Sequence, residues 1–507
     1  MTNSTRILFN TISQYFRTVV NVILALYATR FVLEALGANQ YGIYTLVGGI
    51  VSMMSFFTNA LTQTTQRYLS YNSSIPNHII LKSYFFNSLL IHLSLGVLLL
   101  ILFFSIFPLL FSGFLNIAPE LLPQAKIVFI TIVLMLFVAL LTSPFRATLI
   151  SHENIIYLSI IDIFDGIFKL LIAISLFSFQ DNRLSWYSVF LLSISFFNLI
   201  SIGVYSTLKY NESKSFSIKL FDKRKIKELT SFAGWTMYGM LCLFGRIQGL
   251  SVVLNKFFGT IVNAAYGISL QVNSAIGAVS GSLQTAIAPQ LIKAEGDSKR
   301  AKMIAISETG CKMSFFLISI VGVPIIFNMP FILKIWLGNV PEYASFFCSI
   351  LIVSNIIDQL TVGFNSSLNA VGKIKYNHLI VNSLKLTTVI IIAILLYLNV
   401  SIYIAITSYV LIELVGCILR LLICSKYTTL SILSYFNHVI IRMLAPTFFI
   451  CIGYRLSSPY VNSLWTLILI VMCVSLLYAI LTYVVGLTPN ERIAIKHIFC
   501  NANRNTK

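Results

Sequence analysis

The chain has 507 residues, of which 57% are hydrophobic and only 10% are Asp, Glu, Lys or Arg. A soluble globular domain carries about 25% charged residues, so this composition excludes a water-soluble protein and indicates a surface solvated by lipid. The formal net charge of +19 does not indicate nucleic-acid binding, because no soluble basic module with aromatic or groove-reading elements is present. We expect this charge to reflect the positive-inside rule and contacts with anionic membrane lipids.

Apolar stretches bounded by polar turns predict an all-α, polytopic membrane protein. A helix needs roughly 20 apolar residues to cross a bilayer, which gives about fourteen spans. A barrel of strands would show short alternating segments instead. The order is six spans, a polar stretch, six further spans and a final pair. The predicted spans are 8–36, 43–69, 80–111, 124–149, 155–178, 184–208, 231–258, 262–290, 303–330, 343–368, 377–398, 401–424, 436–456 and 463–486.

Two sequence repeats indicate that the halves are related. Residues 36–67 resemble residues 258–290, since each copy has a glycine, a polar turn, a Tyr-Gly pair, a small-residue helix and a Gln/Thr-rich end. Residues 141–157 resemble residues 360–376 at a similar offset. Duplicated bundles are a common transporter architecture. We therefore predict an N-terminal lobe at 1–208, a basic cytoplasmic linker at 209–230, a C-terminal lobe at 231–424, and a helix pair with a cytoplasmic tail at 425–507.

Lysine and arginine gather in the loops that follow even-numbered spans, most densely in residues 209–227. The loops after odd-numbered spans are poor in both residues. By the positive-inside rule, the basic loops and both termini are expected on the cytoplasmic side.

Polar side chains at membrane depth mark candidate site residues, because they are costly there and normally face protein or a wet cavity. Asn10, Gln14, Arg17 and Asn21 share one face of the first span. Two interpretations stay open: an interhelical hydrogen-bond seam with Arg17 reaching the cytoplasmic surface, or a lumen face that meets an anionic group. Arg246 lies near the middle of the seventh span, too deep to reach the surface easily, which favours a lumen role.

Arg67 and Arg146 lie near span ends on the basic side, where each is either an orienting cation or part of a cytoplasmic mouth. The fifth span contains Asp162, Asp165 and Lys169, and the last two are spaced to pair. These three side chains form either a self-neutralising structural cluster or a site for a coupling proton or cation.

Glu308 and Asp358 are further candidates for ion coupling, whereas Glu413 and Arg420 are expected to form a structural pair. The cysteines and histidines are scattered without a CxxC or a Cys/His cluster, so we predict no metal site. Signatures of soluble enzymes, including a Walker loop and HExxH, are absent. We therefore expect no enzymatic activity and no cofactor, with a proton gradient, a sodium gradient or downhill substrate flow as the energy source.

Six segments together resemble one bacterial export family. They are LGANQYGIY (36–44), PFRATLISHE (144–153), FFGTIVNAAYGISLQV (257–272), APQLIKAEGD (288–297), LKIWLGNVPEYASFF (333–347) and NAVGKIKY (369–376). Over about residues 1–425, the chain resembles the O-antigen and lipopolysaccharide-type flippases of the multidrug/oligosaccharidyl-lipid/polysaccharide exporter superfamily.

This resemblance implies two six-helix lobes around a central cavity, followed by an accessory helix pair, in the bacterial cytoplasmic (inner) membrane. It implies translocation of an undecaprenyl-diphosphate-linked oligosaccharide to the periplasmic leaflet by alternating access. Expected partners are this substrate, membrane lipids, a polysaccharide polymerase and glycosyltransferases, and no nucleic acid. Arginine suits diphosphate because it pairs bidentately with phosphate. The candidate substrate residues are Arg17, Arg246, Arg67, Arg146, Asn21 and Gln14.

Two alternatives accompany this prediction. A multidrug or organic-cation exporter of the same superfamily would need an acidic, aromatic cavity, whereas the deep charges here lean basic. A non-transporting scaffold for glycan-assembly enzymes would not need polar faces inside the membrane. An enzyme that polymerises the glycan would need a large external loop, and the longest external gap, 111–123, is too short for one.

Overall fold

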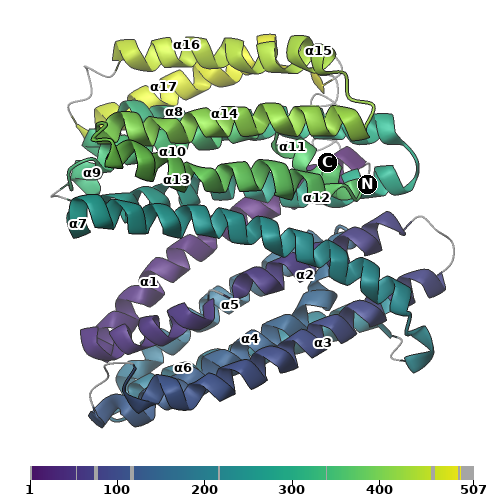
Figure 1. The fold of residues 1–507 in the computed structure, drawn as a ribbon, viewed down its shortest axis with the longest axis vertical. Coiled ribbons are helices and arrows are strands. Elements are labelled where there is room, and N and C mark those ends of the chain that lie inside the picture. Colours follow the sequence, from purple (N-terminus) through teal and green to yellow (C-terminus); the bar gives the residue numbers. More distant parts are fainter. Residues whose placement is uncertain are drawn as a thin grey trace, which may run out of the picture. The chain divides into compact units, whose positions relative to one another are not determined.

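The computed structural model describes residues 3–52, 54–73, 78–114, 119–214, 217–337, 340–457, 463–488 and 491–492. Every regular element within these ranges is a helix (Figure 1). Among the described residues, nine helices are long and apolar enough to cross a membrane, or up to 10 if a pair bent by 47°, Ala344–Gln359 and Val362–Ala370, is one broken span. The prediction of an all-α, multi-pass membrane protein is confirmed.

The remaining predicted spans also form helices, but these are too polar, too short or too bent to count among the nine. The helix at 155–178 holds three ionisable side chains, and 43–69 and 262–290 are rich in Gln, Asn, Ser or Thr. The helix within 436–456 is 17 residues long, and 343–368 is the broken pair. Apolar length alone therefore undercounts the helices, and the helix at 155–178 that it misses carries Asp162, Asp165 and Lys169.

The chain divides into two compact units, and the first comprises Phe9–Met237. Within it, α4 packs against α2, α3 and α6, and buried Phe129, Leu140 and Leu184 belong to its core. The helices of this N-terminal unit are α1 (Asn3–Ser52), α2 (Ser55–Tyr71), α3 (His78–Leu109), α4 (Leu122–Ser151), α5 (Ile155–Ser175), α6 (Arg183–Lys209) and the start of α7 (Lys223–Gly296).

The second unit contains the described residues from Tyr238 onward together with the start of α1, so the boundary falls inside α7. In this C-terminal unit, α14 lies beside α10 and α13 (Figure 1), and α16 packs on both α8 and α17. Its further helices are α8 (Arg300–Phe327), α9 (Met329–Leu337), α10 (Ala344–Gln359), α11 (Val362–Ala370), α12 (Ile374–Tyr376), α13 (Ser383–Tyr397), α14 (Ile402–Tyr427), α15 (Ile432–Tyr435), α16 (Ile441–Ser457) and α17 (Leu464–Leu481).

Short irregular helices complete the connections. The π-helical segments are Leu110–Phe114, Asn377–Asn382, Phe436–Ile440 and Thr482–Gly486, and the 3-10 turns are Pro119–Leu121, Leu176–Ser178, Asn211–Lys214 and Ile218–Leu220.

The first sequence repeat marks a break in both long helices. Gly37 interrupts α1 with φ 70° and ψ 168°, and Gly259 interrupts α7 with φ 77° and ψ −166°. Backbone of this kind is accessible essentially to glycine alone, because any side chain would clash. Each long helix is therefore two helices joined at a glycine, as the predicted boundaries at 36–43 and 258–262 require.

The second repeat encodes the same helix-ending turn in both units. Glu153 after α4 and Gly372 after α11 have positive φ, 59° and 78°. In each turn this residue donates its N–H to the carbonyl three positions back, and the next residue donates to the carbonyl five positions back. Asn182 and Asn399, at the next helix junction of each unit, also share a positive φ, 54° and 58°. The repeat thus extends from sequence to backbone conformation.

Gly363 allows α11 to lie directly against α8, and this contact generates a prediction. A Cβ at Gly363 would lie 2.3 Å from the Ser307 carbonyl oxygen. We expect Gly363→Ala to cost about 1–3 kcal/mol through overpacking and to lower the thermal unfolding midpoint in detergent. Gly203→Ala is the matched control, because a Cβ there meets nothing within 4 Å. Equal midpoints for both variants would contradict the close approach of the two helices.

Candidate functional site

Three charged side chains meet in the N-terminal unit, and we call them the N-terminal cluster: Arg17 on α1, Arg146 on α4 and Asp162 on α5. Arg17 Nη1 donates to Asp162 Oδ2 at 2.5 Å. Arg146 binds the same carboxylate bidentately, with Nη1 to Oδ1 at 3.0 Å and Nη2 to Oδ2 at 2.6 Å. The side chains of Arg17, Arg146 and Asp162 are 23%, 31% and 20% exposed. One carboxylate therefore serves two guanidinium groups at a site that is only partly buried.

The polar face of α1 brings Arg17 to this position. Asn10 donates to the Glu153 carbonyl at 3.1 Å, which ties α1 to the turn between α4 and α5. Gly166 of α5 permits close contact with α1, because a Cβ there would lie 2.8 Å from Asn21 Oδ1. Of the predicted hydrogen-bond seam, Asn10 makes a hydrogen bond to the α4–α5 turn, whereas Arg17 pairs with Asp162. The Gln14 Oε1 and Asn21 Oδ1 oxygens are buried and accept no hydrogen bond from the residues that the structure describes.

Asp165 has different partners from Asp162, although both lie on α5. Lys169 Nζ lies 2.6 Å from Asp165 Oδ2, and Asn198 of α6 donates to Asp165 Oδ1 at 2.8 Å. The predicted pairing of Asp165 with Lys169 is confirmed, whereas a single cluster that includes Asp162 is wrong. Residues three apart differ by about 60° around a helix, which is enough to direct the two carboxylates toward different neighbours.

Arg67, the other predicted cation of this unit, lies among aromatic rings near the end of α2. Its guanidinium carbon is 4.7 Å from the ring centroid of Tyr68, 5.6 Å from that of Tyr71 and 4.8 Å from that of Phe232. The residue is only 8% exposed. Cation–π contacts of this kind stabilise a buried guanidinium, so Arg67 is placed in an aromatic pocket and not with the N-terminal cluster.

The C-terminal unit contains a chain of alternating charges, Arg246–Glu413–Lys385–Asp358–Arg420, which we call the C-terminal chain. Arg246 Nη1 lies 2.9 Å from Glu413 Oε2, and Lys385 Nζ contacts Glu413 Oε1. The same ammonium lies 2.9 Å from Asp358 Oδ1, and Arg420 Nη1 lies 3.0 Å from that oxygen. The chain connects α7, α10, α13 and α14, and Glu413 is only 3% exposed.

The C-terminal chain corrects one predicted pair and shows where Arg246 lies. Glu413 and Arg420 do not pair with each other, because seven residues of helix separate them by roughly 10 Å. Arg246 is 4% exposed, and its guanidinium carbon lies 3.4 Å from the ring centroid of Tyr409. Its guanidinium group is already paired with the Glu413 carboxylate. Sequence interpretation missed Lys385, the central cation. A lone lysine inside the apolar span 377–398 was the available signal.

A polar hollow of about 200 Å³ lies beside the C-terminal chain. Asp358 is its most exposed charged member, at 28%. Glu308, the other predicted single carboxylate, is partly buried on α8 and does not line this hollow. The lining residues are Asn273, Leu351, Ser354, Asn355, Asp358, Lys385, Tyr409 and Glu413.

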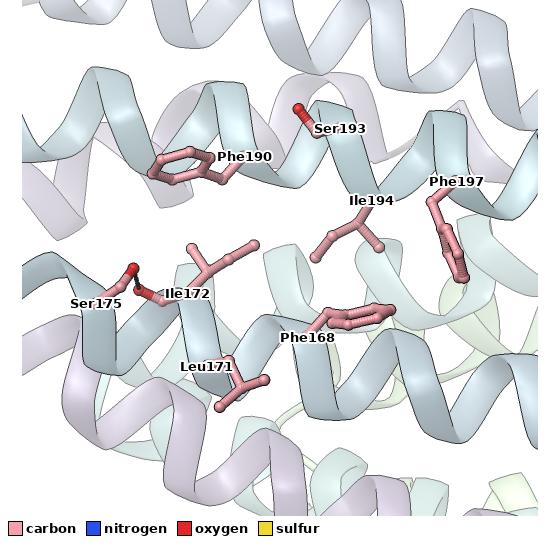
Figure 2. Close-up of a pocket in the computed structure, with 8 residues that line it drawn as sticks. All are labelled: Phe168, Leu171, Ile172, Ser175, Phe190, Ser193, Ile194 and Phe197. Atoms are coloured by element: carbon pink, nitrogen blue, oxygen red, sulfur yellow. Dashed lines mark hydrogen bonds between the residues drawn. The ribbon is translucent and has the colours of Figure 1, made fainter.

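An apolar hollow of about 400 Å³ lies between α5 and α6 in the N-terminal unit (Figure 2). Phe168 and Leu171 line it from α5, and Phe190 and Phe197 line it from α6. Its lining residues within the described part of the chain are all uncharged. Its chemistry suits hydrocarbon and not an ionic group, so the candidate ionic sites are the N-terminal cluster and the polar hollow.

Comparisons with known proteins identify the fold. The chain matches an outward-facing multidrug resistance MATE family transporter of the MOP superfamily with a TM-score of 0.69, at 13% identity over 85% of this chain and 97% of that chain. It matches the MATE transporter ClbM in complex with Rb⁺ with a TM-score of 0.70, at 13% identity over 86% and 96%. It matches a MOP superfamily transporter from Pyrococcus furiosus with a TM-score of 0.71, at 13% identity over 84% and 95%.

At these identities the likeness shows the fold alone. No protein-family model matches the chain, and no curated protein matches its sequence. The protein is therefore a multi-pass membrane protein with the fold of MATE transporters.

The C-terminal chain generates a prediction about stability. Glu413→Gln leaves Arg246 without its carboxylate, and breaking a buried ion pair in this way costs about 3–5 kcal/mol. Lys385→Met should cost less, because Arg246 still holds Glu413 and Arg420 still holds Asp358. Thermal unfolding in detergent should therefore give a lower midpoint for Glu413→Gln than for Lys385→Met. The opposite order would show that Lys385, and not the buried Glu413, contributes most to the stability of the C-terminal chain of charges.

Proposed function

We propose that this protein is a transporter that moves an undecaprenyl-diphosphate-linked oligosaccharide, such as an O-antigen repeat unit, from the cytoplasmic to the periplasmic leaflet of the bacterial inner membrane. The observation that carries this proposal is the surplus of positive charge in the N-terminal cluster. Two guanidinium groups share one carboxylate there, and all three side chains are partly exposed. The protein has no catalytic role in this proposal, and both termini are cytoplasmic.

The chemistry of arginine supports a phosphate cargo. Two guanidinium groups present more N–H donors than one carboxylate has acceptor positions, so donors remain for a further anion. Phosphate oxygens accept bidentate pairs from guanidinium, which supplies both strength and orientation. In the proposal, Arg17 and Arg146 hold the diphosphate, whereas the Gln14 Oε1 and Asn21 Oδ1 oxygens, although on the same face of α1, are buried in this structure.

A second candidate is export of organic cations, and the fold comparison favours it. Among the matched structures is a multidrug resistance MATE family transporter. The charge of the N-terminal cluster opposes this candidate, because its cationic surplus repels a cationic cargo. For the Pyrococcus furiosus transporter, reversed polarity of the binding pocket is taken to suggest a different function, and pocket charge is our criterion as well.

Coupling to a proton or sodium gradient remains a prediction. ClbM binds Rb⁺ in its matched structure, whereas Asp162, Asp358 and Glu413 of this chain are paired with cationic side chains of the protein. Asp358 and Glu413 both contact Lys385, and Asp162 contacts two arginines. Within the described ranges, no group of three or more His, Cys, Asp or Glu residues could hold a metal.

Translocation by purified protein in vesicles tests the proposal. Arg17→Ala and Arg146→Ala should each slow the flipping of undecaprenyl-diphosphate oligosaccharide by about tenfold or more, because each removes charge-assisted hydrogen bonds to phosphate. Each single variant leaves Asp162 paired with the other arginine, so folding should be retained. Arg224→Ala, on the exposed face of the basic linker, is the matched control. Native rates in both arginine variants would refute the proposed site.

The exporter candidate is tested with the same proteins. Cells that express the native chain should show no resistance to cationic dyes, since the cluster repels cations. Dye resistance that Arg17→Ala or Arg146→Ala enhances would favour organic-cation export instead.

A further inference from the structure

Asp162 occupies an unusual position within the N-terminal cluster. A single oxygen, Oδ2, accepts from Arg17 at 2.5 Å and from Arg146 at 2.6 Å, and the two arginines come from different helices. The sequence interpretation separated these residues, with the arginines as substrate ligands and Asp162 as an ion-coupling group. The structure joins them, so the anion that the arginines bind in this state belongs to the protein.

The exposure of the cations distinguishes this cluster from the C-terminal chain, where Asp358 is 28% exposed but its partners Lys385 and Arg420 are only 7% and 5% exposed. Glu413 is 3% exposed and its partner Arg246 is 4% exposed, so a departing carboxylate would have to remain bare in a low-dielectric interior. Asp162 is 20% exposed and Arg146 is 31% exposed. This exposed surface is where water would solvate a departing Asp162 and where a ligand would meet the guanidinium groups.

The charges of the N-terminal cluster favour a ligand with two negative charges. The arginines carry two positive charges, and Asp162 neutralises only one of them. A carboxylate ligand would repeat what Asp162 already supplies, whereas a diphosphate brings more charge and more acceptor oxygens. A ligand that must compete with the Asp162 carboxylate for the two arginines is therefore favoured when it carries a diphosphate group.

We propose that Asp162 is the resident counter-anion of a phosphate-binding pair, Arg17 and Arg146, and that a diphosphate group binds by displacing it. This inference rests on the proposed function and adds how the same site selects and releases its cargo. When the cargo leaves, Asp162 returns to the guanidinium groups, so the arginines are never left unpaired in the membrane. The competition weakens binding, which a transporter needs because its cargo must depart.

Binding of inorganic pyrophosphate to the purified full-length protein tests the displacement. Asp162→Asn removes the competing charge and should bind pyrophosphate about tenfold more tightly than the native chain, the scale of lost charge-assisted hydrogen bonds. Asp165→Asn, one turn away on α5 and paired with Lys169, is the matched control and should bind like the native chain. Asp162→Glu keeps the negative charge and should restore weak binding.

The outcomes separate this inference from the proposed function. Binding that depends on Arg17 and Arg146 but is equal in Asp162→Asn and the native chain overturns the displacement and leaves the phosphate site standing. Binding in no variant, or binding that ignores both arginines, overturns the phosphate site and the displacement together. Phosphatidylglycerol and acetate serve as competitors. Each of these competitors carries a single negative charge, and inorganic phosphate is the reference competitor. If phosphatidylglycerol or acetate displaces pyrophosphate as effectively as inorganic phosphate does, the proposed selection for two charges is wrong.

A second variant keeps the test decisive if Asp162→Asn does not fold. Arg17→Gln/Asp162→Asn removes one charge of each sign, and Arg146 then faces no carboxylate within the cluster. Pyrophosphate binding tighter than in Arg17→Gln alone supports displacement, because both variants keep only Arg146 and differ only in the competing carboxylate. Equal binding in these two variants contradicts it.

Discussion

The cost of an unpaired charge inside a membrane governs the structure around both candidate sites. An ionisable side chain in hydrocarbon needs a partner or water, and this chain supplies partners by sharing carboxylates. Asp162 serves Arg17 and Arg146, and Glu413 serves Arg246 and Lys385. Sharing leaves each group with fewer negative than positive charges. The degree of burial differs between the two groups: Arg246, Lys385 and Arg420 are only 4%, 7% and 5% exposed, whereas Arg17 and Arg146 are 23% and 31% exposed.

The two units share backbone turns at corresponding positions of the sequence repeats but differ in their charged side chains. Gly37 and Gly259 break their helices in the same way, and the turns at Glu153 and Gly372 use the same hydrogen bonds. These joints are fixed by main-chain conformation, which the two units share. The charged residues differ between the units, so a common scaffold holds two distinct ionic arrangements. We attribute structural stability to one arrangement and cargo binding to the other.

Much of the fold could be predicted from the sequence, because apolar length and the glycines at helix breaks are local signals. The spacing of Asp165 and Lys169 likewise predicted their pair, which lies within one helix turn. The partners of Asp162 could not be predicted, since Arg17 is 145 positions away and helix rotation decides which neighbour each carboxylate faces. Lys385 was missed for the same reason: a lysine in an apolar span becomes informative only when Asp358 and Glu413 are seen beside it.

The dependence of transport on cargo charge tests the central claim most directly. Native protein in vesicles would be given one undecaprenyl-linked oligosaccharide in three forms, joined through a diphosphate, a monophosphate or a neutral linkage, and the rate of movement between leaflets would be measured for each. If Arg17 and Arg146 bind the cargo in competition with Asp162, the diphosphate form moves fastest and the neutral form slowest. Equal rates for the three forms would contradict a site that recognises its cargo by negative charge.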